Sequence, residues 1–142
     1  MLVNINQKDK RLLPDIRDYG CLFLCFAQQS SIIFKGDNGC TTLNNIWKQA
    51  IEERIISRDC VIQEHTTLAN KFFLLNVKYD EMHHDADEPI PDDVAFVFGR
   101  FVWKYGHFVI IDKNKNVTFD SLVDSYSVKN GELQSMRFYY AI

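Results

Sequence analysis

Apolar residues follow a helical period in the first half of the chain. After a turn at Tyr19-Gly20, residues 21–29 (CLFLCFAQQ) predict a short helix without a polar face, which must lie inside the fold. A second helix is predicted after the turn at residues 37–39, because apolar residues recur at i, i+3 and i+4 from Leu43 to Ile55. A third helix is predicted to begin at Thr66 or Thr67.

The second half of the chain is rich in Val, Ile, Phe and Tyr, as is typical of strands. Polar turns at residues 113–116 (KNKN) and 129–131 (KNG) indicate antiparallel hairpins, and the acidic segment His83–Asp93 is predicted to be an exposed loop. Helices followed by strands predict one α+β domain over residues 1–142, with N-terminal helices packed on a C-terminal antiparallel β-sheet. The predicted strands are residues 74–79, 94–102, 107–112, 117–120 and 136–142.

Composition and charge narrow the function classes. Hydrophobic residues make up 46% of the 142 residues and charged residues 25%, which is typical of a globular domain. The net charge of -3, without a Lys/Arg cluster, argues against nucleic-acid binding. No segment has the apolar run of a signal peptide or a membrane span, so we expect a cytoplasmic protein without membrane contact and with four free thiols. The sequence indicates no oligomeric state.

Cys21 is the first candidate for chemistry, because it stands at the start of the predicted buried helix. The free N–H groups and the positive dipole end of a helix N-terminus favour a thiolate over a thiol. His107 opens the strand GHFVIID, and Asp120 ends the next strand of the same hairpin, so their side chains are expected to meet. Such a set predicts an imidazole that deprotonates the thiol and a carboxylate that orients the imidazole.

These motifs carry a resemblance. YGC at a helix start, GHFVIID, the following FDS and the closing NGELQSMRFY resemble papain-like cysteine peptidases of the bacteriocin-processing type. They resemble more closely the phage- and plasmid-borne bacterial proteins of that superfamily. The resemblance runs from about Pro14 to Tyr140. It implies a papain-like fold in which Cys21 is the nucleophile, His107 the base and Asp120 the residue that orients it.

One position departs from that family. The bacteriocin-processing peptidases carry a Gln shortly before the cysteine whose amide helps to bind the oxyanion, and this chain has Asp15 there. An ionised carboxylate accepts hydrogen bonds but donates none, so it would repel an oxyanion. Arg17 or an upstream Asn or Gln is a candidate substitute. Trp103 is a candidate for lining the cleft beside His107.

Two functions stay open. The first is a thiol hydrolase that cuts a peptide, isopeptide or amide bond of a peptide or protein substrate and needs no cofactor or metal. The second is a catalytically inactive papain-like binding or assembly module of a phage or mobile element. Asp15 favours the second, as do the bulky residues 22–24 (LFL), which replace the Gly-Pro-Thr of the family.

The acidic loop is a weaker candidate site. His83, His84, Asp85 and Asp87 are side chains that bind divalent metals. Adjacent histidines in an acidic loop are more often solvated, so we expect no metal there. The same loop could instead overhang the cleft and gate it.

Overall fold

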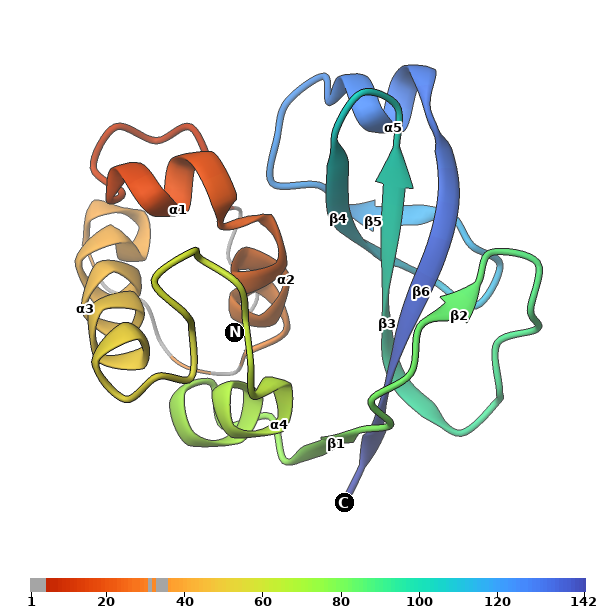
Figure 1. Ribbon diagram of the computed structural model, residues 1–142, viewed down its shortest axis with the longest axis horizontal. Coiled ribbons are helices and arrows are strands. Elements are labelled where there is room, and N and C mark those ends of the chain that lie inside the picture. The colour runs from red at the N-terminus through yellow and green to blue at the C-terminus, as the bar shows by residue number, and fades with distance from the viewer. Residues whose placement is uncertain (1–4, 31, 33–35) are drawn as a thin grey trace.

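Helices and sheet occupy opposite sides of the molecule. The computed structural model describes residues 5–30, 32 and 36–142, and Figure 1 shows helices α1, α2, α3 and α4 to the left and the sheet, with the short helix α5, to the right. Residues 1–4, part of the N-terminal segment in which a signal peptide would lie, are outside the described residues. The helical elements are α1 (Pro14–Tyr19), α2 (Cys21–Gln29), the 3-10 turn η1 (Asp37–Gly39), α3 (Cys40–Glu52), α4 (His65–Thr67), the π-helical turn η2 (Leu68–Phe72) and α5 (Tyr126–Asn130).

The sheet is antiparallel throughout and has the order β1-β6-β3-β4-β5, while β2 pairs with β6 alongside β1. Its longest strand, β6, lies near the middle and pairs with three others. The α+β class with N-terminal helices and a C-terminal antiparallel sheet is therefore confirmed. The strands are β1 (Val77–Tyr79), β2 (His84–Asp85), β3 (Val94–Val102), β4 (Gly106–Ile111), β5 (Val117–Phe119) and β6 (Glu132–Ala141).

Helix α2 lies between the other helices and the sheet, which explains its lack of a polar face. The ring of Phe23 meets Trp47 of α3 edge-on at 5.0 Å. On the other side, the ring of Phe26 meets Phe98 at 5.0 Å and Tyr139 at 5.3 Å. Each edge-to-face pair adds about 0.5–1.5 kcal/mol beyond the burial of its area. These contacts fix α2, and with it Cys21, against the sheet.

Several element boundaries differ from those predicted. A separate helix, α1, precedes α2, so Asp18 lies inside a helix and the N-cap of α2 is Gly20. The segment His83–Asp93 is not wholly an exposed loop, because β2 pairs with β6 and His84 is buried. The turn predicted at residues 129–131 is wrong in part, because Lys129 and Asn130 end an additional short helix, α5, and Gly131 is its C-cap. Within the described residues, no helix is long and apolar enough to cross a membrane.

Candidate active site

Cys21 is the first residue of α2, and Gly20 sets its position. The Gly20 N–H closes α1 on the carbonyl of Ile16 at 2.8 Å, and the Gly20 carbonyl opens α2 by accepting the Leu24 N–H at 2.9 Å. A Cβ on Gly20 would lie 2.5 Å from the Ile16 carbonyl oxygen, so only glycine fits this tight junction. The Cys21 N–H is one of the amides at a helix start that have no partner within the helix.

His107 and Asp120 meet as their strands predict. His107 Nε2 lies 2.6 Å from Asp120 Oδ1, and the same oxygen accepts the Leu122 N–H at 2.9 Å. Burial lowers the pKa of His107, but the hydrogen bonds and charges of Asp120 and Cys21 outweigh burial and raise the pKa to about 9. This environment favours the protonated imidazolium form of His107.

Cys21 lies against the same strand as the imidazole. The backbone N–H of Phe108 donates to Cys21 Sγ at 3.4 Å, which ties the thiol to β4 directly after His107. Since Asp120 occupies Nε2, Nδ1 is the ring nitrogen left to interact with the thiol. The structure thus brings Cys21, His107 and Asp120 together from α2, β4 and the end of β5.

A buried glutamine braces this arrangement from behind. Gln7 accepts the Ser121 hydroxyl at 2.8 Å, and its backbone N–H donates to the Ser121 carbonyl at 2.8 Å. Its side-chain amide donates to the carbonyls of Ile16 at 3.3 Å and Arg17 at 3.1 Å. Gln7 therefore links the residue after Asp120 to α1. Because its amide is committed to carbonyls, it is not the upstream Gln donor considered for the oxyanion.

Cys21 opens on a cleft of about 960 Å³ between the helices and the sheet. The ends of α1 and α2, Trp47 and residues 59–62 form the helical wall, and β2, β3, β4 and β6 form the facing wall. His107 lies beneath this surface with only 6% of its side chain exposed. The thiol is thus the member of the set that a substrate in the cleft would reach first. The charged or polar residues of the sheet wall are His83, Asp85, Arg100, Gln134, Ser135 and Arg137.

Three further predicted site residues lie outside this cleft. Asp15 is exposed and lines a separate groove with Trp47 and Lys48, so it does not take the position of the family's oxyanion Gln. Arg17 is half-buried and does not line the cleft; its Nε is buried without a hydrogen-bond partner in the described part of the chain. Trp103 does not line it either, because its ring stacks on Tyr126 at 5.8 Å.

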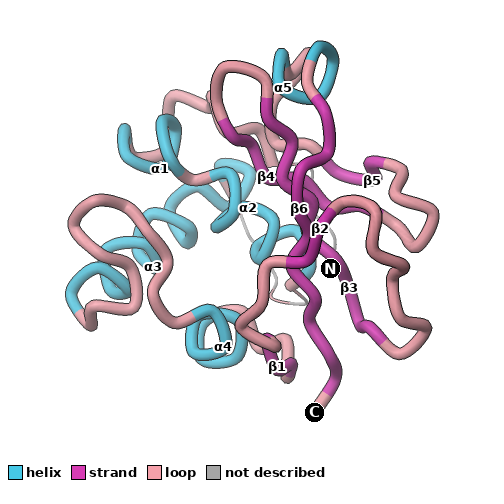
Figure 2. The backbone as a smooth tube through the Cα atoms, turned by 45° about the vertical axis from the view of Figure 1, so that its right-hand side comes forward, coloured by secondary structure: helices cyan, strands magenta, loops and turns pink. Residues whose placement is uncertain are grey.

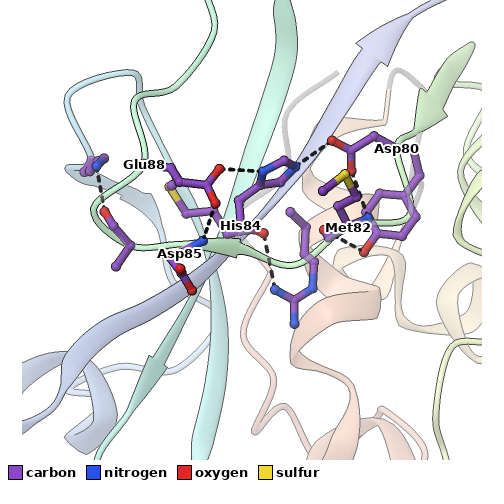
Figure 3. Close-up of polar contacts among 10 residues, drawn as sticks. Asp80, Met82, His84, Asp85 and Glu88 are labelled. Carbon is purple, nitrogen blue, oxygen red and sulfur yellow. Dashed lines mark hydrogen bonds and ion pairs between the residues drawn. The ribbon is translucent and has the colours of Figure 1, made fainter.

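A second histidine, His84, is enclosed by carboxylates (Figure 3). Its Nε2 lies 2.6 Å from Asp80 Oδ2 and its Nδ1 lies 2.8 Å from Glu88 Oε2. Burial lowers the pKa of His84, but the two carboxylates outweigh burial and raise it. The ring also stacks on Phe138, with centroids 3.9 Å apart. Among the described residues, no group of three His, Cys, Asp or Glu side chains is arranged to hold a metal ion.

Among the described residues, no hydrogen bond joins any of the other three cysteines to a histidine. Cys25 is fully buried, and burial raises the pKa of its thiol well above the usual value. Cys40 is also buried. Cys60 is half-exposed and lines the same cleft as Cys21. Cys60 therefore provides an internal reference for the reactivity of Cys21.

Arg100 and Arg137 also face the cleft, although neither was predicted as a site residue. The sequence does carry a signal for them. Each is a single charge inside an otherwise apolar strand segment, VAFVFGRFV for Arg100 and MRFYY for Arg137. A charge at such a position is rare unless it is paired or serves a site.

Fold and site together define an α+β protein in which a thiol at a helix N-terminus meets a histidine–carboxylate pair of the sheet. The chain belongs to the family DUF261, described as a protein of unknown function, whose model matches residues 1–141. Comparison with curated proteins and with solved structures gave no match.

Proposed function

We propose that the protein is a thiol hydrolase of the papain-like superfamily that cuts a peptide, isopeptide or amide bond. The observation that carries this proposal is the contact set of His107. Its Nε2 binds Asp120 at 2.6 Å, and the neighbouring Phe108 N–H holds Cys21 Sγ at 3.4 Å. A cleft of about 960 Å³ then gives a substrate access to the thiol.

The reaction follows from the positions of these groups. Cys21 Sγ attacks the carbonyl carbon, and the C–N bond breaks as His107 gives its proton to the leaving amine. The product is a thioester on Cys21. A water molecule then attacks the thioester while His107 takes its proton, which releases the acid and restores the thiol. Asp120 holds the imidazole in position and stabilises its charged form throughout.

The free N–H of Cys21 is one donor for the oxyanion. A side-chain donor from Asp15 or Arg17 is not supported, because neither residue lines the cleft. This observation favours the second candidate function, a papain-like module that binds a partner in the cleft without cutting it. Loss of one oxyanion donor costs roughly 10²–10³ in rate, so an enzyme that uses the Cys21 N–H alone would be slow.

Hydrolysis of p-nitrophenyl acetate separates the two functions, since this ester acylates any active thiol. An enzyme gives a burst of one nitrophenolate per protein followed by steady turnover. We expect the burst and the turnover to vanish in Cys21→Ala and to persist in Cys60→Ala, which removes the other thiol of the cleft. A burst without turnover would support the binding module. A wild-type protein that is folded but gives no burst would overturn the hydrolase proposal.

A further inference from the structure

Two arginines stand in the cleft without a carboxylate partner. Among the described residues, neither Arg100 nor Arg137 forms an ion pair with a carboxylate. Arg137 is only 5% exposed, and its Nη1 donates to Ser135 Oγ at 3.0 Å and to the Met136 carbonyl at 3.3 Å. A buried charge without a counter-ion is costly, so its retention points to a ligand.

The guanidinium of Arg137 lies beside the proposed catalytic groups. Its Cζ is 5.3 Å from the ring centroid of Phe108, the residue whose N–H holds the Cys21 thiol. Burial lowers the pKa of Arg137; Tyr79 and Tyr139 raise it, and the positive charge of Arg100 lowers it. The pKa of His83 is also lowered, by burial and then by both arginines. Both guanidinium groups and His83 therefore lie within electrostatic reach of one another on the sheet wall of the cleft.

Two neighbours fix the position of the Arg100 guanidinium: Gly106 leaves room for it, and the Gln134 side chain accepts its hydrogen bond. Gly106, the residue before His107, has no side chain, and a Cβ there would collide with the Arg100 guanidinium. In the pairing of β3 with β6, Arg100 lies opposite Ser135 and Phe101 opposite Leu133, so Gln134 is the extra residue of a bulge. The Gln134 Oε1 accepts Arg100 Nη1 at 2.5 Å. A neutral amide thus orients the guanidinium without neutralising it.

We propose that Arg100 and Arg137 form a subsite that binds a carboxylate group of the substrate next to Cys21 and His107. This inference rests on the proposed function and names its substrate class: peptides that carry either an acidic side chain or a free C-terminal carboxylate near the bond to be cut. Guanidinium groups match a carboxylate in charge and geometry. The acids that line the cleft, Asp18, Asp59 and Asp85, leave both guanidiniums unpaired and available.

Two alkylating agents that differ only in charge test the subsite without requiring catalysis. Iodoacetate carries a carboxylate, and iodoacetamide is its neutral counterpart. We expect Arg100→Gln to lower the ratio of the iodoacetate rate to the iodoacetamide rate at Cys21 roughly threefold or more, because a cation beside the thiol is lost. Lys48→Gln, which removes an exposed charge on α3, should leave the ratio unchanged. The His107 imidazolium is present in both variants and cancels from the comparison.

Arg137→Lys keeps the positive charge at the buried position, so it provides a second test if another variant fails to fold. It should keep the ratio closer to the wild-type value than Arg100→Gln does. An unchanged ratio in Arg100→Gln would overturn the subsite. Failure of the hydrolase proposal is a separate result, since it appears as an absent ester burst and not in this ratio.

Peptides that protect Cys21 from iodoacetamide identify the source of the carboxylate. One peptide carries an internal Glu and an amidated C-terminus, a second carries Gln and a free C-terminus, and a third carries neither charge. Protection by the first or the second at a concentration roughly tenfold lower than by the third would support the subsite and show which carboxylate it binds. Equal protection by all three, or stronger protection by inorganic phosphate, would overturn the assignment.

Discussion

His107 and His84 both hydrogen bond an aspartate at 2.6 Å through Nε2, and both have a raised pKa. They differ at the second ring nitrogen. In His84, Nδ1 binds Glu88, so both nitrogens are occupied by carboxylates (Figure 3). In His107, Nδ1 is left to the thiol of Cys21. When both ring nitrogens bind carboxylates, neither is free to exchange a proton with a substrate, whereas a histidine between a carboxylate and a thiol keeps one nitrogen for proton transfer.

The two histidines also differ in their access to the cleft. His84 stacks on Phe138 and joins β2 to the segments before and after it through Asp80 and Glu88. Strand β2 lies beside β6 (Figure 2). His107 lies under a cleft, between the sheet and the start of α2. The comparison indicates that a histidine–carboxylate pair becomes a candidate for catalysis through its third partner and its access to a cleft. His84 serves the stability of the fold.

Replacing each histidine separately should give the largest effects, and it tests whether His107 acts in the reaction while His84 stabilises the fold. We expect His107→Gln to lower the turnover of p-nitrophenyl acetate by roughly 10²–10⁴, because the general base is lost. His84→Gln should lower the thermal midpoint of unfolding and keep the turnover of the folded protein near that of the wild type. Turnover rates and melting curves of both variants provide the measurement. Equal losses of turnover in the two folded variants would remove the distinction.

Replacement of Asp120, the aspartate of the proposed catalytic set, should give the next largest effect. Asp120→Asn still offers an oxygen to His107 Nε2 but carries no charge, so the pKa of His107 should fall below about 9. Ester turnover should fall by roughly tenfold or more. NMR titration of the imidazole protons follows the pKa directly. Asp80→Asn is the matched control and should shift the pKa of His84 alone.

The carboxylates of His84 should affect stability. We expect Asp80→Asn to lower the free energy of unfolding by about 1–2 kcal/mol, and Glu88→Gln by less, because Glu88 is the more exposed of the two. The folded pKa of His84 is raised, so this contribution is complete below the unfolded pKa of about 6.5 and is lost as the pH rises through the folded value. Urea unfolding on both sides of pH 6.5 measures it. A loss that grows with pH would contradict this account.

A carboxylate that touches neither histidine should have the smallest effect. Asp15→Gln introduces the amide that the papain-like resemblance predicts at this position, but the side chain lies in a different groove. We therefore expect no gain in ester turnover and a stability change within about 0.5 kcal/mol. An increase in turnover would show that residue 15 reaches the oxyanion after all.

The predictable part of the fold is the part with a strong periodic pattern. Strand β3 and helix α2 have the predicted bounds, because a long run of apolar residues has few other ways to be buried. Strand β2 was not predicted. It has only two residues, and its pairing with Met136 and Ser135 is decided by the distant strand β6. Short elements of this kind follow from tertiary pairing more than from their own sequence.

Some contacts of the candidate site could likewise be predicted from the sequence, and others could not. His107 and Asp120 could be paired from the sequence because one short hairpin joins them. Arg100 and Arg137 lie far apart in the chain, and they converge because β3 pairs with β6, with Arg100 opposite Ser135 and Phe98 opposite Arg137. The placement of Asp15 depends on where α1 turns relative to α2 at Gly20. No periodicity encodes either feature.

The central claim is that His107 makes Cys21 a nucleophile, and Cys60 allows it to be tested within one molecule. Both cysteines are half-exposed and line the same cleft. His107 interacts with Cys21, whereas burial, Asp15 and Asp59 raise the pKa of the Cys60 thiol. The measurement is the iodoacetamide alkylation rate of each thiol at neutral pH, resolved by mass spectrometry. We predict that Cys21 reacts at least about tenfold faster than Cys60 and that His107→Gln removes most of this difference. Equal rates in the wild type, or a Cys21 rate that His107→Gln leaves unchanged, would contradict the account.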